Sequence, residues 1–233
     1  MRIAGLQKLT LLDYPGHLAC TVFLEGCNLR CPFCHNASLV LPERAGEDEE
    51  VSEEELFAFL TKRRGVLQGV CITGGEPLLW DKTEELIGRI REMGYAVKLD
   101  TNGCFPDRLK TLIEKKLVDY VAMDIKNAPS RYPETVGIAG FDTAPVERSA
   151  ALLMRGEVEY EFRTTVVGEL HTEADFEEIG RWLAGAKRYF LQGFVDSGDL
   201  IAAGLHAASR AQMERFAAAV RKNIPSVELR GVS

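Results

Sequence analysis

The chain has 233 residues, of which 46% are hydrophobic, and it carries a formal net charge of −7. Neutralising phosphates needs a basic face, so the acidic balance argues against nucleic acid as the main partner. The apolar runs have the length of strands and are too short to cross a membrane, and the first residues lack the pattern of a secretory signal. We therefore expect a cytoplasmic protein, in which six cysteines, three of them clustered, indicate metal binding or catalysis rather than disulfides.

Runs rich in β-forming residues alternate with helical patterns along the chain. These runs predict strands at 19–25, 69–73, 95–100, 120–126, 159–167 and 188–194. Helices are expected at 53–64, 82–93, 106–116, 144–155, 173–185 and 209–222, the first of them with a capping box of Ser52 and Glu55. An acidic stretch at 43–55 is expected to be solvated, and a short strand at 226–230 to lie at a sheet edge.

Six strand–helix alternations predict an α/β fold with a parallel sheet and helical crossovers. Six units are too few for a closed eight-unit barrel, which leaves a partial, open barrel or a doubly wound sheet. No repeat or convincing linker divides the chain, so we expect a single domain over residues 1–233.

The segment GCNLRCPFCHN, residues 26–36, places three thiols at Cys27, Cys31 and Cys34. The spacing would fit one face of a helix, but Pro32 and the loop-forming residues around it make a regular helix unfavourable. A zinc site with His35 as fourth ligand is a second reading, although adjacent ligands are poorly spaced for one ion. The third reading is a [4Fe–4S] cluster, in which three thiolates leave one iron open for a substrate or cofactor.

The pattern CxxxCxxC, with Phe33 directly before the third cysteine, resembles the motif of radical S-adenosylmethionine (SAM) enzymes. The resemblance implies a partial (β/α)6 TIM-like barrel, a [4Fe–4S] cluster held by Cys27, Cys31 and Cys34, and SAM bound at the open iron. In that family the reduced cluster cleaves SAM to methionine and a 5′-deoxyadenosyl radical, which abstracts a hydrogen atom.

Two further segments follow predicted strands and resemble cofactor-binding parts of this family. Gly74 and Gly75 would let backbone groups approach a ligand, and with Glu76 they resemble the segment that binds the SAM amino group. Asp100 and Asn102 end the next strand, where open α/β sheets bind ligands. The Asn-Gly pair is otherwise an ordinary turn signal.

Charged residues also stand at the ends of later strands. Asp124 and Lys126 share a strand face and resemble a SAM-binding segment of glycyl-radical-enzyme activases, in which Asp100, Thr101 and Asp124 match a monovalent-cation pattern. Arg163 resembles the basic residue near the SAM carboxylate, with a surface ion pair as its alternative.

Two more side chains have open roles. His171 follows the strand predicted at 159–167, and Gln192 lies near the end of the strand predicted at 188–194. Either side chain would face the site or have a structural role alone. Of the three remaining cysteines, Cys20 and Cys71 are read as core residues of strands, and with Cys104 they are too few for a second four-cysteine cluster.

The opening residues through CPFCHN, together with TGGEPLL, DTNG and MDIK, resemble the anaerobic ribonucleoside-triphosphate reductase activating proteins. This resemblance implies that the radical is transferred to a glycine of that reductase, and that a flavodoxin- or ferredoxin-type protein donates the electron. The alternatives are a small-molecule radical SAM enzyme similar to 7-carboxy-7-deazaguanine synthase, and a non-enzymatic metal-binding redox protein. The segment 35–70 has no cysteine, so a ferredoxin-like insert with further clusters is not expected.

Overall fold

The strands form one eight-stranded sheet in which spatial order follows chain order. The computed structural model describes residues 1–41 and 50–232. Neighbouring strands from β2 to β8 are parallel, whereas β1 is antiparallel to β2. The strands are β1 (Ile3–Thr10), β2 (Ala19–Leu24), β3 (Gly69–Gly74), β4 (Ala96–Thr101), β5 (Tyr120–Asp124), β6 (Glu159–Val166), β7 (Tyr189–Gly193) and β8 (Val227–Arg230).

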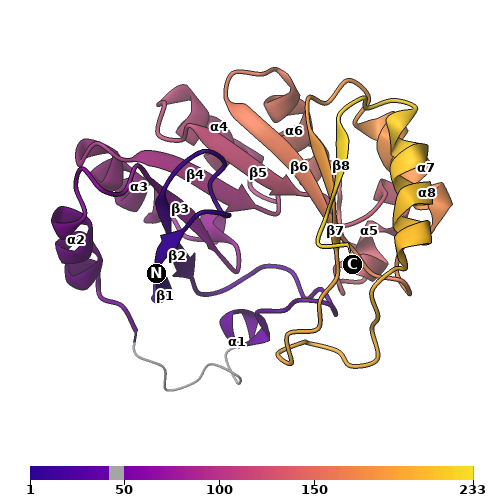
Figure 1. Cartoon of the computed structure of the whole chain (residues 1–233), viewed down its shortest axis with the longest axis horizontal. Coiled ribbons are helices and arrows are strands. Elements are labelled where there is room, and N and C mark those ends of the chain that lie inside the picture. Colours follow the sequence, from indigo (N-terminus) through magenta and orange to yellow (C-terminus); the bar gives the residue numbers. More distant parts are fainter. Residues whose placement is uncertain (42–49, 233) are drawn as a thin grey trace.

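Six long helices connect the parallel strands and lie around the outer side of the curved sheet (Figure 1). They are α2 (Glu53–Lys62), α3 (Thr83–Glu92), α4 (Pro106–Glu114), α6 (Ala144–Met154), α7 (Glu173–Trp182) and α8 (Arg210–Arg221). All six predicted strand–helix units are therefore confirmed, as is the edge strand near the C-terminus. The predicted capping box also forms, since the side chains of Ser52 and Glu55 each accept a hydrogen bond from the other residue's backbone N–H.

The sequence patterns did not predict strand β1 or the shorter elements. Two register irregularities, between Ile3 and Gly5 and between Gln7 and Thr10, interrupt the alternation of buried and exposed side chains along β1. The short elements are α1 (Ala37–Val40), η2 (Pro77–Leu79), η3 (Pro129–Arg131) and α5 (Tyr132–Thr135). Most of the acidic stretch expected to be solvated, residues 43–49, lies outside the described residues.

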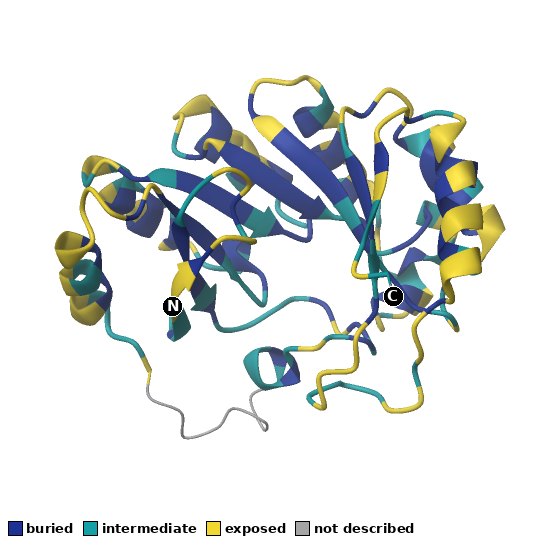
Figure 2. Ribbon diagram, viewed as in Figure 1, coloured by how far each residue is buried: buried dark blue, intermediate teal, exposed yellow. Residues whose placement is uncertain are grey.

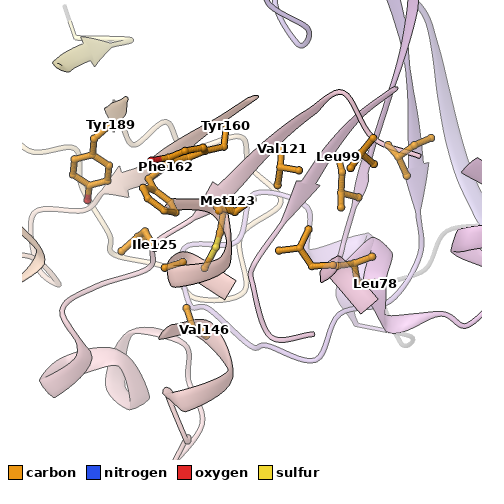
Figure 3. Packing of buried hydrophobic residues seen from close by; sticks show 14 of the residues in the cluster. Leu78, Leu99, Val121, Met123, Ile125, Val146, Tyr160, Phe162 and Tyr189 are labelled. Atoms are coloured by element: carbon orange, nitrogen blue, oxygen red, sulfur yellow. The ribbon is translucent and has the colours of Figure 1, made fainter. Parts of the chain in front are cut away.

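The two faces of the sheet differ in chemistry because successive side chains of a strand point to opposite sides. The face toward the outer helices is apolar and includes Leu99, Val121, Met123 and Phe162, which pack together in Figure 3. Figure 2 shows the resulting layer of buried strands beneath helices with exposed outer surfaces. The inner face carries polar and charged side chains instead, so it is suited to binding a polar ligand.

The open side of the curved sheet lies between its two ends, where α1 and the segments around it are found (Figure 1). Residues 195–208 join β7 to α8, and we call them the strap. The strap contacts the chain around α1, because Ala202 N donates to Pro32 O at 2.9 Å and Ser38 N donates to Asp199 Oδ2 at 2.9 Å. None of the described helices is long and apolar enough to cross a membrane.

Candidate active site

A cavity of about 330 Å³ lies at the carboxyl ends of the central strands. It brings together most of the residues that the sequence singled out, from segments more than a hundred residues apart. The predicted residues that line it are Cys27, Cys31, Phe33, Cys34, Gly74, Gly75, Asp100, Thr101, Asn102, Asp124, Lys126, Arg163 and Gln192. Glu76 and His171 are not among the lining residues.

The three-cysteine segment is an irregular loop after β2, as Pro32 predicted. Arg30 holds it in place, since its backbone N donates to Val136 O at 3.0 Å and its guanidinium Nη1 donates to Cys27 O at 2.7 Å. A side chain at Gly137 would put its Cβ 2.3 Å from Arg30 O, so the α5 segment can approach this loop only with glycine there. The thiols are therefore positioned by tertiary contacts rather than by a helix.

The thiols of this loop fit a cluster that is bound as thiolates. Cys27 Sγ accepts a hydrogen bond from Leu29 N at 3.4 Å and another from Asn102 Nδ2 at 3.8 Å. Such donors stabilise sulfur ligands of iron–sulfur clusters. Burial raises the pKa of Cys27 to about 12 and that of Cys31 to about 11, so a bound cation is needed to keep either thiol ionised near neutral pH.

The described residues contain no group of three or more His, Cys, Asp or Glu side chains arranged for one metal ion. Three thiolates that bind different irons of a cluster need not converge on one point. The loop therefore matches the cluster reading in its chemistry: three thiols, N–H donors to sulfur, and a shared cavity.

Gly74 and Gly75 are required by the close approach of two protein segments. A Cβ at Gly74 would lie 2.1 Å from Leu24 O, and one at Gly75 would lie 2.0 Å from Gly26 O. Gly75 N donates to Leu24 O at 2.9 Å and Glu76 N donates to Gly26 O at 2.8 Å, which joins the end of β3 to the end of β2 and to the start of the cysteine loop. The sequence predicted that these glycines let backbone groups approach a ligand. In the structure they let the end of β3 approach the cysteine loop.

Glu76 is fully buried and faces protein donors. Its Oε1 accepts from Leu78 N at 3.0 Å and from Thr101 Oγ1 at 2.8 Å, while Oε2 accepts from Asn102 N at 2.6 Å. Burial raises its pKa to about 7, although these hydrogen bonds favour the ionised form. The carboxylate therefore links β3 to β4 and meets the cavity through Asn102.

The inner face of β4, β5 and β6 carries a chain of alternating charges. Arg163 lies between two carboxylates, with Nη1 3.2 Å from Asp100 Oδ2 and Nε 2.9 Å from Asp124 Oδ1. Lys126 Nζ lies 2.9 Å from Asp124 Oδ2, and Lys98 pairs with Asp100 Oδ1. We refer to these five residues as the charge chain.

The charge chain sets the ionisation of its members. Burial alone would raise the pKa of Asp124, but Arg163 and Lys126 outweigh it and hold that pKa well below its usual range. Burial would lower the pKa of Arg163, whereas Asp100 and Asp124 raise it further above its usual value. Both groups are thus charged at neutral pH, and the surface ion pair considered for Arg163 is instead an ion pair inside the cavity.

The two residues with open roles differ in position. Gln192 lines the cavity at the end of β7. His171 is buried, with Nε2 2.9 Å from Lys126 O and Nδ1 3.1 Å from the N–H of Val167. His171 therefore supports the backbone at Lys126 and does not face the cavity.

The charge chain also contacts the cysteine loop. The ammonium of Lys126 lies 6.0 Å from the centre of the Phe33 ring.

Sequence reasoning missed several residues of this site. Lys98 carries a recognisable signal, since it stands two residues before Asp100 and hence on the same strand face. Asp13, whose Oδ2 accepts from Thr21 Oγ1 at 2.6 Å, lines the cavity from the loop between β1 and β2. Asp199 has no local signal, because its contact with Ser38 spans 161 positions.

The predicted core positions are confirmed, as Cys20 and Cys71 are both fully buried.

Comparisons with known proteins agree with this geometry. A family model described as the radical SAM superfamily matches residues 21–183. A protein of Methanocaldococcus jannaschii named as a glycyl-radical enzyme activating enzyme is 33% identical over 198 residues, which cover 82% of this chain and 79% of that protein. A 7-carboxy-7-deazaguanine synthase of Methanopyrus kandleri is 35% identical over 132 residues, which cover 48% of this chain and 50% of that protein.

Among solved structures, Streptococcus suis SuiB bound to its precursor peptide SuiA has a TM-score of 0.68 at 16% identity. The match covers 91% of this chain and 48% of that one. At this identity the likeness shows that the two chains share a fold.

Proposed function

Because the chain belongs to the radical SAM superfamily, we propose that it activates a glycyl-radical enzyme, most specifically anaerobic ribonucleoside-triphosphate reductase. A single observation carries the proposal: the three thiols of the cysteine loop line the same cavity as the charged ends of β4, β5 and β6. A protein that only carries a metal would not need the charged side chains beside the thiols.

The cofactors are a [4Fe–4S] cluster and SAM, as in the superfamily to which the chain belongs. Cys27, Cys31 and Cys34 would hold the cluster as thiolates. When bound, the cluster would supply the electron that cleaves SAM to methionine and a 5′-deoxyadenosyl radical, the species able to remove a hydrogen atom from a glycine.

The other cavity residues would bind and orient SAM. The charge chain has three cations and two carboxylates, so its net positive charge would attract the SAM carboxylate, with Lys126 beside Phe33 of the cysteine loop. The backbone at Gly74 and Gly75 offers carbonyl acceptors to the SAM amino group, and the Phe33 ring offers an apolar surface. Glu76 would act by positioning Asn102 rather than by touching SAM.

A protein substrate is supported by the surface beside the cavity. Gln7 and Asp13 line the cavity, and the chain between them exposes Leu9, Leu11 and Leu12 by 56%, 72% and 90%. Three exposed leucines within four residues are typical of a protein contact surface rather than of solvent-facing chain. A partner bound there would be placed to insert a glycine-bearing loop into the cavity.

The second candidate is a small-molecule radical SAM enzyme, which the likeness to 7-carboxy-7-deazaguanine synthase favours. The match to that synthase covers half of each chain, whereas the match to the activating enzyme covers about four-fifths. The longer match and the exposed leucines both favour a protein substrate.

We further propose that residues 1–233 act as one domain in the cytoplasm, with a flavodoxin- or ferredoxin-type donor. One sheet extends from residue 3 to residue 230, which supports a single unit. The six cysteines are free, which suits a reducing compartment.

The test is anaerobic electron paramagnetic resonance of the reconstituted, reduced protein with SAM and the same organism's anaerobic ribonucleotide reductase. A glycyl radical doublet on the reductase is the expected result. A reduced-cluster signal that responds to SAM without any glycyl radical would move the proposal to another substrate. The absence of a cluster after competent reconstitution would contradict it altogether.

A further inference from the structure

Lys98 is a buried lysine on the inner face of β4, with only 2% of its side chain exposed. Its ammonium pairs with Asp100 Oδ1, and Nζ lies 3.8 Å from Cys71 Sγ. A buried ammonium is costly unless it neutralises an opposite charge. Lys98 does not itself line the cavity, and its side chain lies on the same face of β4 as Asp100, which does.

The carboxylates that match the monovalent-cation pattern are already occupied by this chain's own cations. Asp100 is paired through one oxygen with Lys98 and through the other with Arg163. Asp124 is likewise paired through one oxygen with Arg163 and through the other with Lys126. All four carboxylate oxygens therefore have a cationic partner.

The third member of the pattern, Thr101, is also engaged. Its hydroxyl donates to Glu76 Oε1 at 2.8 Å and accepts from Gly103 N at 3.1 Å. An alkali cation needs several oxygen ligands, and the three predicted ones have protein partners instead. The residues present do not fit such an ion.

The charge balance points the same way. The charge chain carries one net positive charge, which a single carboxylate of a ligand would neutralise. An added alkali cation would increase that charge and would compete with Lys98 and Arg163 for the same oxygens. Lys98 thus does what an alkali cation would do: it compensates the charge of Asp100, from a buried position that does not line the cavity.

We propose that the Lys98 ammonium takes the place of a monovalent cation, so that SAM binding by this chain requires no alkali ion. This inference rests on the proposed function, because SAM is the ligand whose binding is measured. It extends that function by assigning a specificity-determining role to a residue of this chain.

The first experiment uses the wild-type protein with its reconstituted cluster. The dissociation constant of SAM is measured from the change in the reduced-cluster resonance signal at equal ionic strength in potassium, sodium or tetramethylammonium chloride. We expect values that agree within about threefold. A larger loss of affinity in tetramethylammonium would overturn the proposal.

The second experiment uses Lys98→Met, which keeps an unbranched side chain of similar size and removes the charge. We expect SAM affinity to fall at least about tenfold in tetramethylammonium and to recover in potassium or sodium, because Asp100 then has a free oxygen for the ion. A loss that neither ion relieves would assign Lys98 to the fold alone and would overturn the proposal. Lys110→Met on the exposed side of α4 is the matched control, expected to bind SAM as wild type does in every salt.

Iron content and far-ultraviolet circular dichroism show whether Lys98→Met is folded and carries its cluster. If the variant does not fold, the salt comparison of the wild-type protein still tests the proposal. The two proposals fail in different ways. If the wild type neither binds SAM nor forms 5′-deoxyadenosine in any salt, the proposed function fails and this inference with it. If it does both but only with an alkali ion, the function stands and the role of Lys98 is wrong.

Discussion

Glu76 Oε2 accepts a hydrogen bond of 2.6 Å from the backbone N–H of Asn102, and this contact joins the ends of two neighbouring strands. The Asn102 side chain in turn donates to Asn28 Oδ1 at 2.9 Å and lies 3.8 Å from Cys27 Sγ. A carboxylate that does not line the cavity is therefore connected to the cysteine loop through one intermediate residue. The orientation of Asn102 depends on that connection.

Glu76→Gln should destabilise the protein and weaken SAM binding without removing iron. The amide of Gln can accept only through one oxygen, so a buried N–H loses its partner at a cost of about 1–3 kcal/mol in the free energy of unfolding. Urea unfolding and SAM titration of the loaded protein measure the two effects. Glu114→Gln is the exposed control, and unchanged SAM affinity in Glu76→Gln would remove Glu76 from the positioning of the site.

Cys31→Ala should abolish cluster assembly and SAM cleavage while the sheet remains folded. Two thiolates cannot hold a cluster that needs three protein ligands and an open iron. Iron content and 5′-deoxyadenosine formation are the measurements. Cys20→Ala in the buried part of β2 is the control and should keep its iron; 5′-deoxyadenosine from reconstituted Cys31→Ala would refute the cluster assignment.

Gly75→Ala should impair cluster loading, because its Cβ would lie 2.0 Å from the carbonyl oxygen of Gly26 at the start of the cysteine loop. Gly88→Ala is the matched control, since Gly88 lies in α3 and a Cβ there meets no atom within 4 Å. The control should stabilise the protein by about 0.5–1 kcal/mol through its higher helix propensity. Thermal unfolding and iron content measure both variants, and equal iron loading in the two would contradict the packing argument.

Asp199→Ala should speed the loss of iron from the cluster. Asp199 Oδ2 accepts from Ser38 N at 2.9 Å in the first turn of α1, four residues after Cys34, so the strap restrains that end of the cysteine loop. Loss of such a bond is expected to increase the rate of iron removal by a chelator about fivefold. Asp199→Asn keeps an acceptor and should restore most of the wild-type rate.

Asp196→Ala is the control for the strap, because Asp196 Oδ1 accepts from Gly198 N at 2.8 Å, a hydrogen bond within the strap itself. An equal increase in iron loss for Asp196→Ala and Asp199→Ala would show that the strap as a whole, rather than its contact with α1, protects the cluster.

His171→Gln should flatten the dependence of stability on pH below neutrality. Burial lowers the pKa of His171 below its ordinary 6.5, so between that value and the folded pKa the unfolded chain binds more protons. Its stabilising contribution is complete above pH 6.5 and is lost as pH falls toward the folded pKa.

Denaturant unfolding from about pH 7.5 to about pH 5.5 tests this prediction. Wild type should lose more unfolding free energy than His171→Gln over that range. The opposite trend from Glu76, whose raised pKa of about 7 lowers stability as pH rises, is present in both proteins and cancels in the comparison. Parallel profiles would show that His171 does not titrate with unfolding.

The sequence by itself determined the six strand–helix units and the positions of the site residues along the chain. Alternating hydrophobicity is a local property, and the ends of parallel strands meet at one edge of a sheet whatever else the fold does. Cys27, Asp100 and Asp124, which follow or end strands, could therefore be placed at one edge of the sheet, whereas Arg163 was assigned to the site through the family resemblance. The irregular conformation of the cysteine loop could also be predicted locally, because Pro32 disfavours a regular helix.

Only the tertiary structure decided what each side chain faces. Glu76 and His171 bind protein groups and do not line the cavity, whereas Asn102 and Gln192 line it, although all four stand near strand ends or turns that look alike in sequence. The strap contact of Asp199 joins residues 161 positions apart. Such pairings depend on the curvature of the sheet and on close packing across it, which arise from the whole fold rather than from any local pattern.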